Sequence, residues 1–343
     1  MSILNTLQPQ FQPAFPRLAS GNYVHFVMVR HSQSFPIFQT DGILNTARTQ
    51  AGLNNTDKIS RLVMFKRKQV SPERLAGREL LRSLNLITSE GEVGKPDNFC
   101  RYGGEKFCGK CPDCVIYGFA VGDSGSERAK VYSDSAFSLS PYEESHRSFT
   151  FNALNENGTM MLDADDPKRN PEKMTRASIN ELDHILPEIT FPTVETLRDS
   201  TYEGFIYVLG NLLRTRRYGA QESRTGTMAN HLIGIVFCDG EIFSNLHFTQ
   251  ALYDALKGDI NAPIGDICTT ARDVMQDLLN QEPVRTTQII LGDELENLLE
   301  EVAAIYQSEE QLQATLTTLY QQAQAYAETF GALTGKKRIS KNK

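Results

Sequence analysis

The sequence has no tryptophan and only six histidines among 343 residues. The histidines are scattered, and neither a His-Glu-x-x-His nor a Gly-x-Ser-x-Gly motif occurs. This excludes the common signatures of zinc hydrolases and serine hydrolases. The glycine-containing segment "GFAVGDSGSERAK" lacks the lysine spacing of a Walker loop and does not match a dinucleotide-binding fingerprint. The sequence therefore offers little support for an ordinary hydrolase or nucleotide-dependent enzyme.

The sequence also lacks any apolar run of the length that spans a bilayer. Residues 1–18 do not combine a basic region with a following apolar stretch, as a secretory signal would. With 40% hydrophobic and 22% charged residues, the composition is that of an ordinary globular protein. We expect a cytoplasmic protein with no membrane partner, folded as one elaborated domain or two.

Charge is spread unevenly along the chain. The formal net charge of −7 would disfavour a nucleic-acid partner if it were uniform. Residues 1–100, however, carry 12 Lys and Arg against 7 Asp and Glu, whereas residues 241–335 carry 3 against 15. The sequence thus predicts a basic N-terminal region and an acidic C-terminal one.

Four of the six cysteines lie close together, at Cys100, Cys108, Cys111 and Cys114. In a reducing compartment such a cluster more often binds metal than forms disulfides. Four thiolates satisfy a tetrahedral structural zinc ion and leave no open position for catalysis. We therefore predict structural Zn²⁺, which would staple an insertion too small to build its own core.

Iron–sulfur binding and the absence of any metal are the two alternatives for this cluster. The Cys-x2-Cys-x2-Cys run is similar to the start of a ferredoxin signature, in which the fourth cysteine lies downstream and precedes a proline. Here the fourth cysteine, Cys100, lies upstream. A redox protein built on such a centre would often bind a nucleotide cofactor, and the sequence lacks the glycine-rich motif for one.

Strands and helices are mixed through about residue 245. Apolar and β-branched runs predict strands at 22–30, 61–70, 127–139 and 231–237. The clearest helix is predicted over 71–87, where Ser71 can cap it and Pro72 occupies its first turn. Residues 204–214 are typical of a strand passing into a helix.

Two further features complete this outline. Residues 146–162 predict a hairpin that turns at Asn157 and Gly158, and residues after 246 follow a helical pattern to about 335. The polar segment 39–58 is predicted to be a long loop. The fold class is therefore α+β with insertions.

Basic residues beside glycine and aromatic residues suggest RNA binding. Arginine forks suit phosphate oxygens and aromatic rings provide stacking platforms, which single-stranded RNA requires together. For cations on a helix face, such as Arg74 and Arg82, an ordinary solvated charge is the simpler interpretation. The candidate contacts are Lys66, Arg128, Lys130, Arg216, Arg217, Tyr218 and Arg224.

Several segments in combination resemble a known family. They are "QTDGILNTARTQAG", "RLVMFKRKQVSPERLAGRELL", "CPDCVIYGFAVGDSGSERAKVYSDSAF" and "RRYGAQESRTG". Across residues 20–250 the chain resembles the RAMP superfamily of CRISPR proteins. Within it, the chain is most similar to the seven-series backbone subunit of type I-D Cascade.

The resemblance implies a modified RRM-like (ferredoxin-like) core with zinc-binding, thumb or lid, and helical insertions. Residues 1–95 and 127–245 would form the two parts of the core, the first with a basic loop and the second with a thumb hairpin near 146–175. Residues 96–126 would form the zinc-binding insertion, 246–335 the helical region, and 336–343 a disordered basic tail.

The resemblance also implies a function in antiviral defence. Several copies would oligomerise along one guide crRNA, beside other Cascade subunits, and support pairing with a complementary DNA or RNA target. It adds Arg30 and Arg48 to the candidate RNA contacts. Protein contacts would read the phosphate and ribose, and base pairing would read the sequence.

The alternative is a metal-dependent nuclease that cuts the paired target at regular intervals. Related backbone subunits cut RNA with a loop aspartate, and Asp41 lies in a comparable region. An aspartate directly before glycine is, however, first of all a turn residue. We therefore expect a non-catalytic scaffold, with Asp41 as the only weak catalytic candidate.

Overall fold

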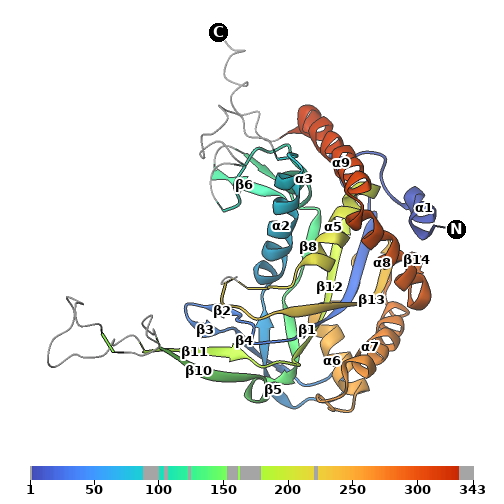
Figure 1. The fold of residues 1–343 in the computed structure, drawn as a ribbon. Coiled ribbons are helices and arrows are strands. Elements are labelled where there is room, and N and C mark those ends of the chain that lie inside the picture. Colours follow the sequence, from blue (N-terminus) through green and yellow to red (C-terminus); the bar gives the residue numbers. More distant parts are fainter. Residues whose placement is uncertain are drawn as a thin grey trace, which may run out of the picture.

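Helices and strands alternate along the chain and pack into one mixed α+β structure (Figure 1). This computed structural model describes residues 2–87, 100–103, 107–122, 125–152, 161–162, 179–219 and 223–331. The predicted turn at Asn157 and Gly158 and the basic tail 336–343 lie outside the described residues. In the part of the chain that is described, no helix combines the length and apolarity needed to cross a bilayer.

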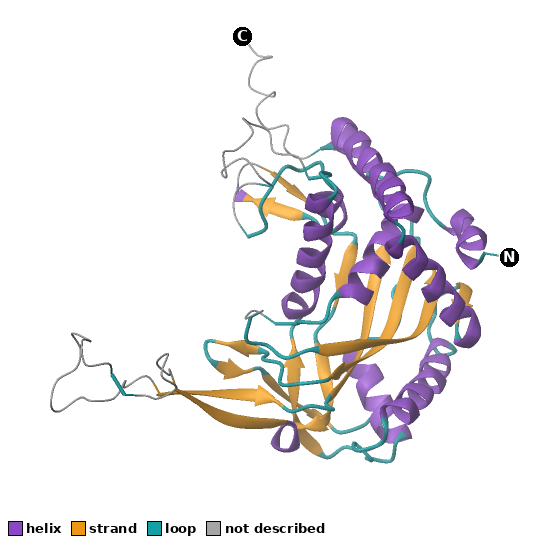
Figure 2. Ribbon diagram, viewed as in Figure 1, coloured by secondary structure: helices purple, strands orange, loops and turns teal. Residues whose placement is uncertain are grey.

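The centre of the structure is an antiparallel five-stranded sheet in the order β14-β13-β1-β12-β8 (Figure 2). Strand β1 lies in the middle, and its Val27 pairs with Val194 of β12 and Gly234 of β13. Both faces of β1 are covered, which explains its nearly continuous apolar sequence. The strands are β1 (Tyr23–Ser32), β8 (Val131–Ser133), β12 (Thr190–Arg198), β13 (Met228–Cys238) and β14 (Thr286–Ile290).

Alternate residues of β1 enter two different cores. Phe26 and Met28 face a core shared with α2 (Lys66–Ser83), α5 (Tyr202–Arg214), α8 (Gly292–Gln307) and α9 (Glu309–Phe330). Val27 and Val29 face a second core formed with α6 (Asn245–Ala255) and α7 (Ile264–Leu279). In chain order, β1, α2, β8, β12, α5 and β13 follow a β-α-β-β-α-β pattern.

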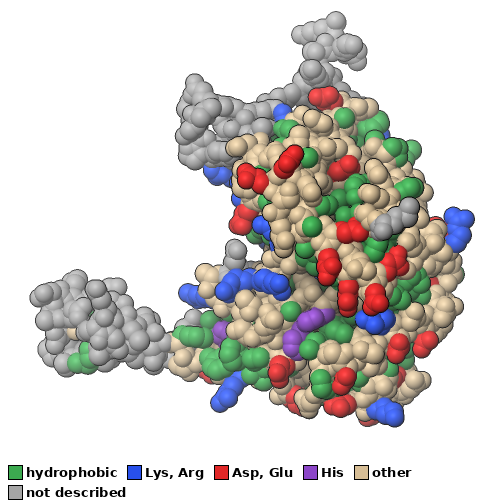
Figure 3. Space-filling view, turned by 45° about the vertical axis from the view of Figure 1, so that its right-hand side comes forward, with side chains coloured by type: hydrophobic (Ala, Val, Ile, Leu, Met, Phe, Trp, Pro, Cys, Tyr) green, Lys and Arg blue, Asp and Glu red, His purple; other side chains and the backbone are tan. Residues whose placement is uncertain are grey.

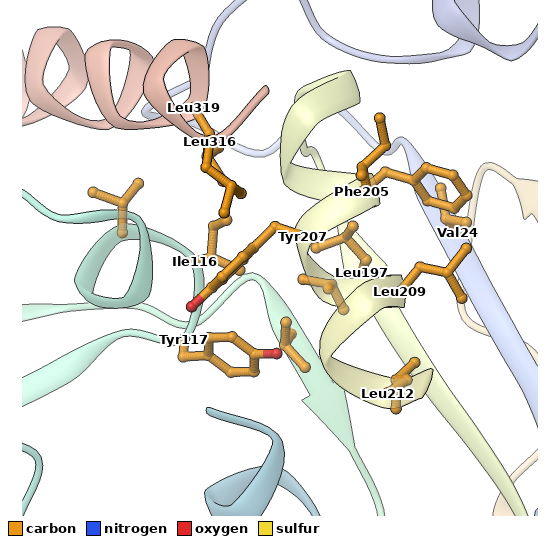
Figure 4. Packing of buried hydrophobic residues seen from close by; sticks show 14 of the residues in the cluster. Val24, Ile116, Tyr117, Leu197, Phe205, Tyr207, Leu209, Leu212, Leu316 and Leu319 are labelled. Atoms are coloured by element: carbon orange, nitrogen blue, oxygen red, sulfur yellow. The ribbon is translucent and has the colours of Figure 1, made fainter. Parts of the chain in front are cut away.

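Helix α5 lies at the centre of the larger core and packs against both the sheet and the cysteine segment. Figure 4 shows Phe205 and Leu209 facing Val24 and Leu197 of the sheet, while Tyr207 points toward Ile116 and Tyr117. Each of these α5 side chains is buried completely. The cysteine segment therefore shares the main core through α3 (Pro112–Ile116), which is followed by β6 (Phe119–Val121) and β7 (Gly125–Glu127).

Smaller sheets extend from the core. Strands β4 (Thr46–Gln50), β5 (Lys58–Met64) and β9 (Ala136–Pro141) form a three-stranded sheet. Strands β2 (Gln39–Thr40) and β3 (Ile43–Leu44) form a hairpin. After the short helix α4 (Tyr142–Ser145), β10 (His146–Asn152) pairs with β11 (Ile179–Ile185) to form an arm that projects from the body (Figure 1).

The structure corrects four sequence-based assignments. The segment 39–58 contains β2, β3 and β4 and is not one long loop. Strand β5 ends at Met64, and the following Lys-Arg-Lys run already belongs to α2, so Ser71 does not cap this helix, Pro72 lies inside it, and it ends at Ser83 instead of residue 87. Residues 204–214 are entirely helical because Thr201 caps α5 by accepting a hydrogen bond from the Gly204 amide. Strand β14 lies within the region expected to be helical, where it completes the central sheet.

The N-terminal residues are fastened to the C-terminal helices. Helix α1 (Ile3–Leu7) and the 3₁₀ turn η1 (Gln8–Gln10) precede β1. The carboxylate of Glu301 on α8 accepts hydrogen bonds from the Ser2 hydroxyl and from the amides of Ile3 and Leu4, at 2.8 to 2.9 Å. A carboxylate at a helix N-terminus is favourable because it meets unpaired amides.

Stability should depend on pH through His25, which is buried on β1. Its Nδ1 accepts a hydrogen bond from the Thr196 hydroxyl at 2.7 Å, and its Nε2 donates to the Gly240 carbonyl at 3.0 Å. Burial lowers the pKa of His25 to about 4. Between pH 6.5 and 4 the unfolded chain binds more protons than the folded chain, so stability is lost as pH falls, by up to about 3 kcal/mol.

We predict that His25→Gln reduces this acid sensitivity. Denaturant unfolding at pH 7, 5.5 and 4.5 should show a smaller loss of unfolding free energy in His25→Gln than in the wild type. His247→Gln, which alters an exposed histidine, should leave the wild-type pH profile unchanged. Equal slopes for the wild type and His25→Gln would contradict this assignment.

Candidate nucleic-acid groove and cysteine module

The four clustered cysteines converge on one point. All four sulfur atoms lie within 4.8 Å of one another, with Cys100 Sγ 3.6 Å and Cys108 Sγ 4.0 Å from Cys114 Sγ. A tetrahedral ion with metal–sulfur bonds of about 2.3 Å would hold its sulfurs about 3.8 Å apart. The four residues can therefore hold a metal ion. Among the described residues, no other group of three or more His, Cys, Asp or Glu side chains is so placed.

Two buried arginines of α2 form ion pairs with the cysteine module, which comprises residues 100–127. Asp113 accepts hydrogen bonds from Arg74 Nε at 2.8 Å and Nη2 at 2.9 Å, and it also pairs with Arg78. Arg78 donates in addition to the Cys100 carbonyl. Four thiolates around a divalent cation would carry two net negative charges, and Asp113 adds a third. The two guanidiniums offset most of that charge inside the core, so the surroundings fit a metal–tetrathiolate site.

A groove of about 720 Å³ opens beside this module. It lies between α2, the β2–β3 hairpin and the segment 214–219, which begins at the last residue of α5. Five cationic side chains line it against two acidic ones, Asp41 and Glu79; the cations are Arg67, Lys68, Arg214, Arg216 and Arg217. The groove is therefore an electropositive site inside an acidic protein.

The charge distribution over the surface agrees with this assignment. In Figure 3, Lys and Arg side chains gather beside the arm, whereas Asp and Glu side chains predominate over the helical side. Burial and the neighbouring Arg67 lower the pKa of Lys68. Burial is the larger of these two causes, and an anionic ligand beside Lys68 would favour its charged form.

Part of the predicted RNA-binding set lies at this groove. Arg216 and Arg217 line it and are exposed, and Lys66 is exposed at the start of α2. Arg224 is exposed in the adjoining loop, which is joined to the groove wall by a hydrogen bond from Arg217 Nη1 to the Thr225 carbonyl at 2.6 Å. Four of the nine predicted contacts therefore come together at or beside one surface.

Three other predicted contacts lie elsewhere. Arg48 is exposed on β4 and does not line the groove. Arg128 and Lys130 line a separate pocket of about 170 Å³ beside α9. Lys130 is buried, and its ammonium donates to the Val115 carbonyl at 3.1 Å and lies 3.6 Å from Glu127. Its charge supports internal packing instead of facing a ligand.

Arg30 and Tyr218, also predicted as RNA contacts, are buried completely. Arg30 donates to Glu73 at 2.7 Å and to Glu195 at 3.2 Å, and its guanidinium lies 4.6 Å from the centre of the Tyr218 ring. The Tyr218 hydroxyl donates to Glu73 at 2.9 Å. The prediction of direct contact is corrected, because both side chains point into a core that β1 and α2 close.

This buried group combines one guanidinium with two carboxyl groups. Burial alone would lower the pKa of Arg30, but Tyr218, Glu73 and Glu195 together raise it. Burial and the facing Glu73 carboxylate raise the pKa of Glu195 well above its usual range. Burial therefore disfavours the charged form of Glu195, although its carboxyl group still lies 3.2 Å from the Arg30 guanidinium.

Asp41 is a turn residue of the β2–β3 hairpin. Its φ is 52° and that of Gly42 is 83°, so both central residues are left-handed, as a two-residue type I′ turn requires. Asp41 does line the groove. Within the described residues, however, it belongs to no group of acids or histidines that could hold a metal ion.

Sequence reasoning missed two aromatic residues of the groove. Phe65, at the N-cap of α2, is 43% exposed, and Tyr102 is half-buried. Both line the groove. Phe65 directly precedes the basic run 66–68, so an aromatic next to adjacent cations was the available signal. Tyr102 had no such signal, because it lies among the cysteine ligands.

These features define a class of protein: an α+β scaffold that builds a metal-binding module and a cation-lined groove around one helix. A family model described as Csc2 Crispr matches residues 10–316. The chain therefore belongs to the Csc2 family of CRISPR proteins.

One solved structure shares the fold. The crystal structure of Thermofilum pendens Csc2 is 13% identical, with a TM-score of 0.60, and the match covers 96% of this chain and 98% of that one. A chain of a CRISPR RNA-guided surveillance complex is 14% identical, with a TM-score of 0.44, and the match covers 77% of this chain and 86% of that one. A chain of a CRISPR RNA-guided surveillance complex in a pre-nicking state is 12% identical, with a TM-score of 0.49, and the match covers 82% of this chain and 99% of that one. No curated protein sequence matches the chain significantly.

We predict that Asp113→Asn destabilises the protein. The variant leaves Arg74 and Arg78 buried without a carboxylate, which should lower the free energy of unfolding by about 3 kcal/mol or more in denaturant titrations. Asp273→Asn, at an exposed position on α7, should change it by less than about 0.5 kcal/mol. Similar values for the two variants would show that the buried pair does not fasten the module.

Proposed function

We propose that this protein is a non-catalytic backbone subunit of a CRISPR effector complex and that it binds guide crRNA in the groove. Membership of the Csc2 family supports a function in CRISPR defence. The observation that carries RNA binding is the groove itself, where five cations and two aromatic residues face one recess. Phosphate oxygens would meet guanidiniums while unstacked bases or riboses meet rings.

The chemistry of the groove favours backbone recognition over sequence recognition. Arg214 at the end of α5 and Arg216 and Arg217 just after it line the groove within four residues, and guanidiniums suit phosphate oxygens. No rigid set of donors and acceptors is needed for the bases, because the guide must stay free to pair with its target. Binding would therefore be salt-sensitive and largely independent of sequence.

Assembly into a type I-D Cascade is the finer part of this proposal. Several copies would lie along one crRNA, with other Cascade subunits at the ends and a complementary DNA or RNA target paired to the guide. The β10–β11 arm would be the thumb. It projects from the body (Figure 1), and its Phe149 and Phe151 alternate with Ser148 and Thr150, so one face is aromatic and the other polar.

We also infer that the core is a modified RRM-like unit and that the metal is structural zinc. The β-α-β-β-α-β order of the central elements supports the first inference. The close sulfur separations support the second, because a four-iron cluster binds each cysteine through a different iron and would hold the sulfurs further apart. Cysteine ligands Cys100, Cys108, Cys111 and Cys114 would leave no open position for chemistry.

The groove can be tested by charge reversal. Arg216→Glu with Arg217→Glu should weaken binding of a fluorescein-labelled single-stranded RNA by about 100-fold at low salt, measured by fluorescence anisotropy. The slope of log affinity against log salt should shrink by about 1.4, since two phosphate contacts are lost.

A matched control has the same charge change away from the groove. Lys257→Glu with Arg285→Glu alters two exposed cations on the acidic side. This variant should retain RNA affinity within about threefold. If both double variants lose affinity equally, net charge and not the groove governs binding, and the proposal fails.

The nuclease alternative predicts a different result. We expect that the purified effector assembly, incubated with Mg²⁺ and end-labelled complementary target, produces no fragments that depend on Asp41. The reason is that Asp41 serves the type I′ turn and, among the described residues, shares no metal site. Evenly spaced fragments that disappear in Asp41→Ala would establish the nuclease instead.

A further inference from the structure

Tyr102 belongs to the cysteine module yet lies in the wall of the groove. It follows Cys100 by two residues, and the Cys108 amide donates to Cys100 Sγ at 3.3 Å, which closes the loop that carries it. Among the described residues that line the groove, Tyr102 alone comes from the module. The loop that supplies two metal ligands therefore also supplies part of the candidate RNA surface.

Helix α2 orients the ring of Tyr102. Its hydroxyl lies 2.6 Å from Ser71 Oγ, and the Arg74 guanidinium lies 4.7 Å from the ring centre. The side chain is half-buried, so part of the ring stays open to the groove. A tyrosine held at its hydroxyl and covered on one side by a cation is a rigid platform, which loses little entropy when a base or ribose stacks on it.

Arg74 connects this platform to the metal site. The same guanidinium that covers Tyr102 donates twice to Asp113, which lies between Cys111 and Cys114 in sequence. Tyr102 is thus tied to the cysteine cluster along its own loop and, through Arg74 and Asp113, across space. Loss of the bound ion would loosen the first connection, because Cys100 and Cys108, on either side of Tyr102 in sequence, would no longer be held by one ion.

We propose that Tyr102 is an RNA-stacking residue of the groove and that metal occupancy of the cysteine module and RNA binding strengthen each other through it. This inference rests on the proposed function, since it names the partner of the same groove. Thermodynamic linkage makes the coupling reciprocal: if metal raises RNA affinity by a given factor, RNA raises metal affinity by that factor.

The stacking contact is tested with zinc-loaded full-length protein and a fluorescein-labelled single-stranded RNA. Tyr102→Ala should weaken RNA binding about 10-fold, because one base–aromatic contact is lost. Tyr102→Phe should stay within about threefold of the wild type, since it keeps the ring. Tyr102→Leu fills the space without a π face and should resemble Tyr102→Ala, which guards against a packing artefact.

Tyr253→Ala is the matched control. Tyr253 is a half-buried tyrosine on α6, and Arg61 lies 5.3 Å from its ring centre, so it shares the local chemistry of Tyr102 without lining the groove. Its replacement should leave RNA affinity unchanged. An affinity loss as large as that of Tyr102→Ala would show that general destabilisation explains both, and would overturn the assignment.

The coupling has its own readout, which does not depend on any variant that fails to fold. Zinc affinity is measured by competition with a chromophoric chelator, with and without saturating RNA. RNA should raise the zinc affinity of the wild type by about fivefold or more and should have little effect on that of Tyr102→Ala. A zinc affinity that RNA leaves unchanged in the wild type overturns the proposal, as does wild-type RNA affinity in Tyr102→Ala.

These outcomes separate the inference from the proposed function. If Arg216→Glu with Arg217→Glu abolishes RNA binding while Tyr102→Ala binds normally, the groove binds RNA and only the assignment of Tyr102 is wrong. If neither variant changes affinity, the groove is not the RNA site and both proposals fall.

Discussion

The structure depends on helix α2 being held on two sides by buried charges. Glu73 faces the central sheet and pairs with Arg30, while Arg74 and Arg78 face the cysteine module and pair with Asp113. Buried ion pairs are costly to desolvate, so they specify an arrangement more than they add stability. Here they determine the position of the first turns of α2, which carry Arg67 and Lys68 into the groove.

The acidic composition of the protein is compatible with an anionic ligand because its charges are segregated. The acidic excess lies mostly on the C-terminal helices, of which α7 and α8 pack on β13 and α9 packs on α5 and α8. The groove instead opens between α2 and the β2–β3 hairpin. Exposed charges further apart than about 10 Å are largely screened at ordinary salt. A strand in the groove would therefore experience the local cations more than the overall negative charge.

The cysteine module is not an independent appendage. Cys114, Val115 and Ile116 are fully buried in the same core as α5 and α9. A metal ion held there would fasten a segment that has a share of the main core but few regular elements of its own. The segment also forms one wall of the groove through Tyr102, so its internal order and the shape of the candidate RNA surface are linked.

Sequence alone was sufficient for local features. The apolar run at 22–30 and the spacing of the four cysteines reflect interactions within a few residues, and they correspond to β1 and the sulfur cluster. The helix signal at 71–87 identified α2 but not its bounds, since α2 runs from Lys66 to Ser83. Which cations reach solvent was decided only by tertiary packing. Arg217 and Tyr218 are neighbours, yet one lines the groove and the other is buried beside Arg30, because the closing of α2 over β1 determines which side of the backbone is interior. Tyr102 joined the groove for the same physical reason: burial and proximity depend on contacts between residues far apart in sequence, and composition and spacing do not encode them directly.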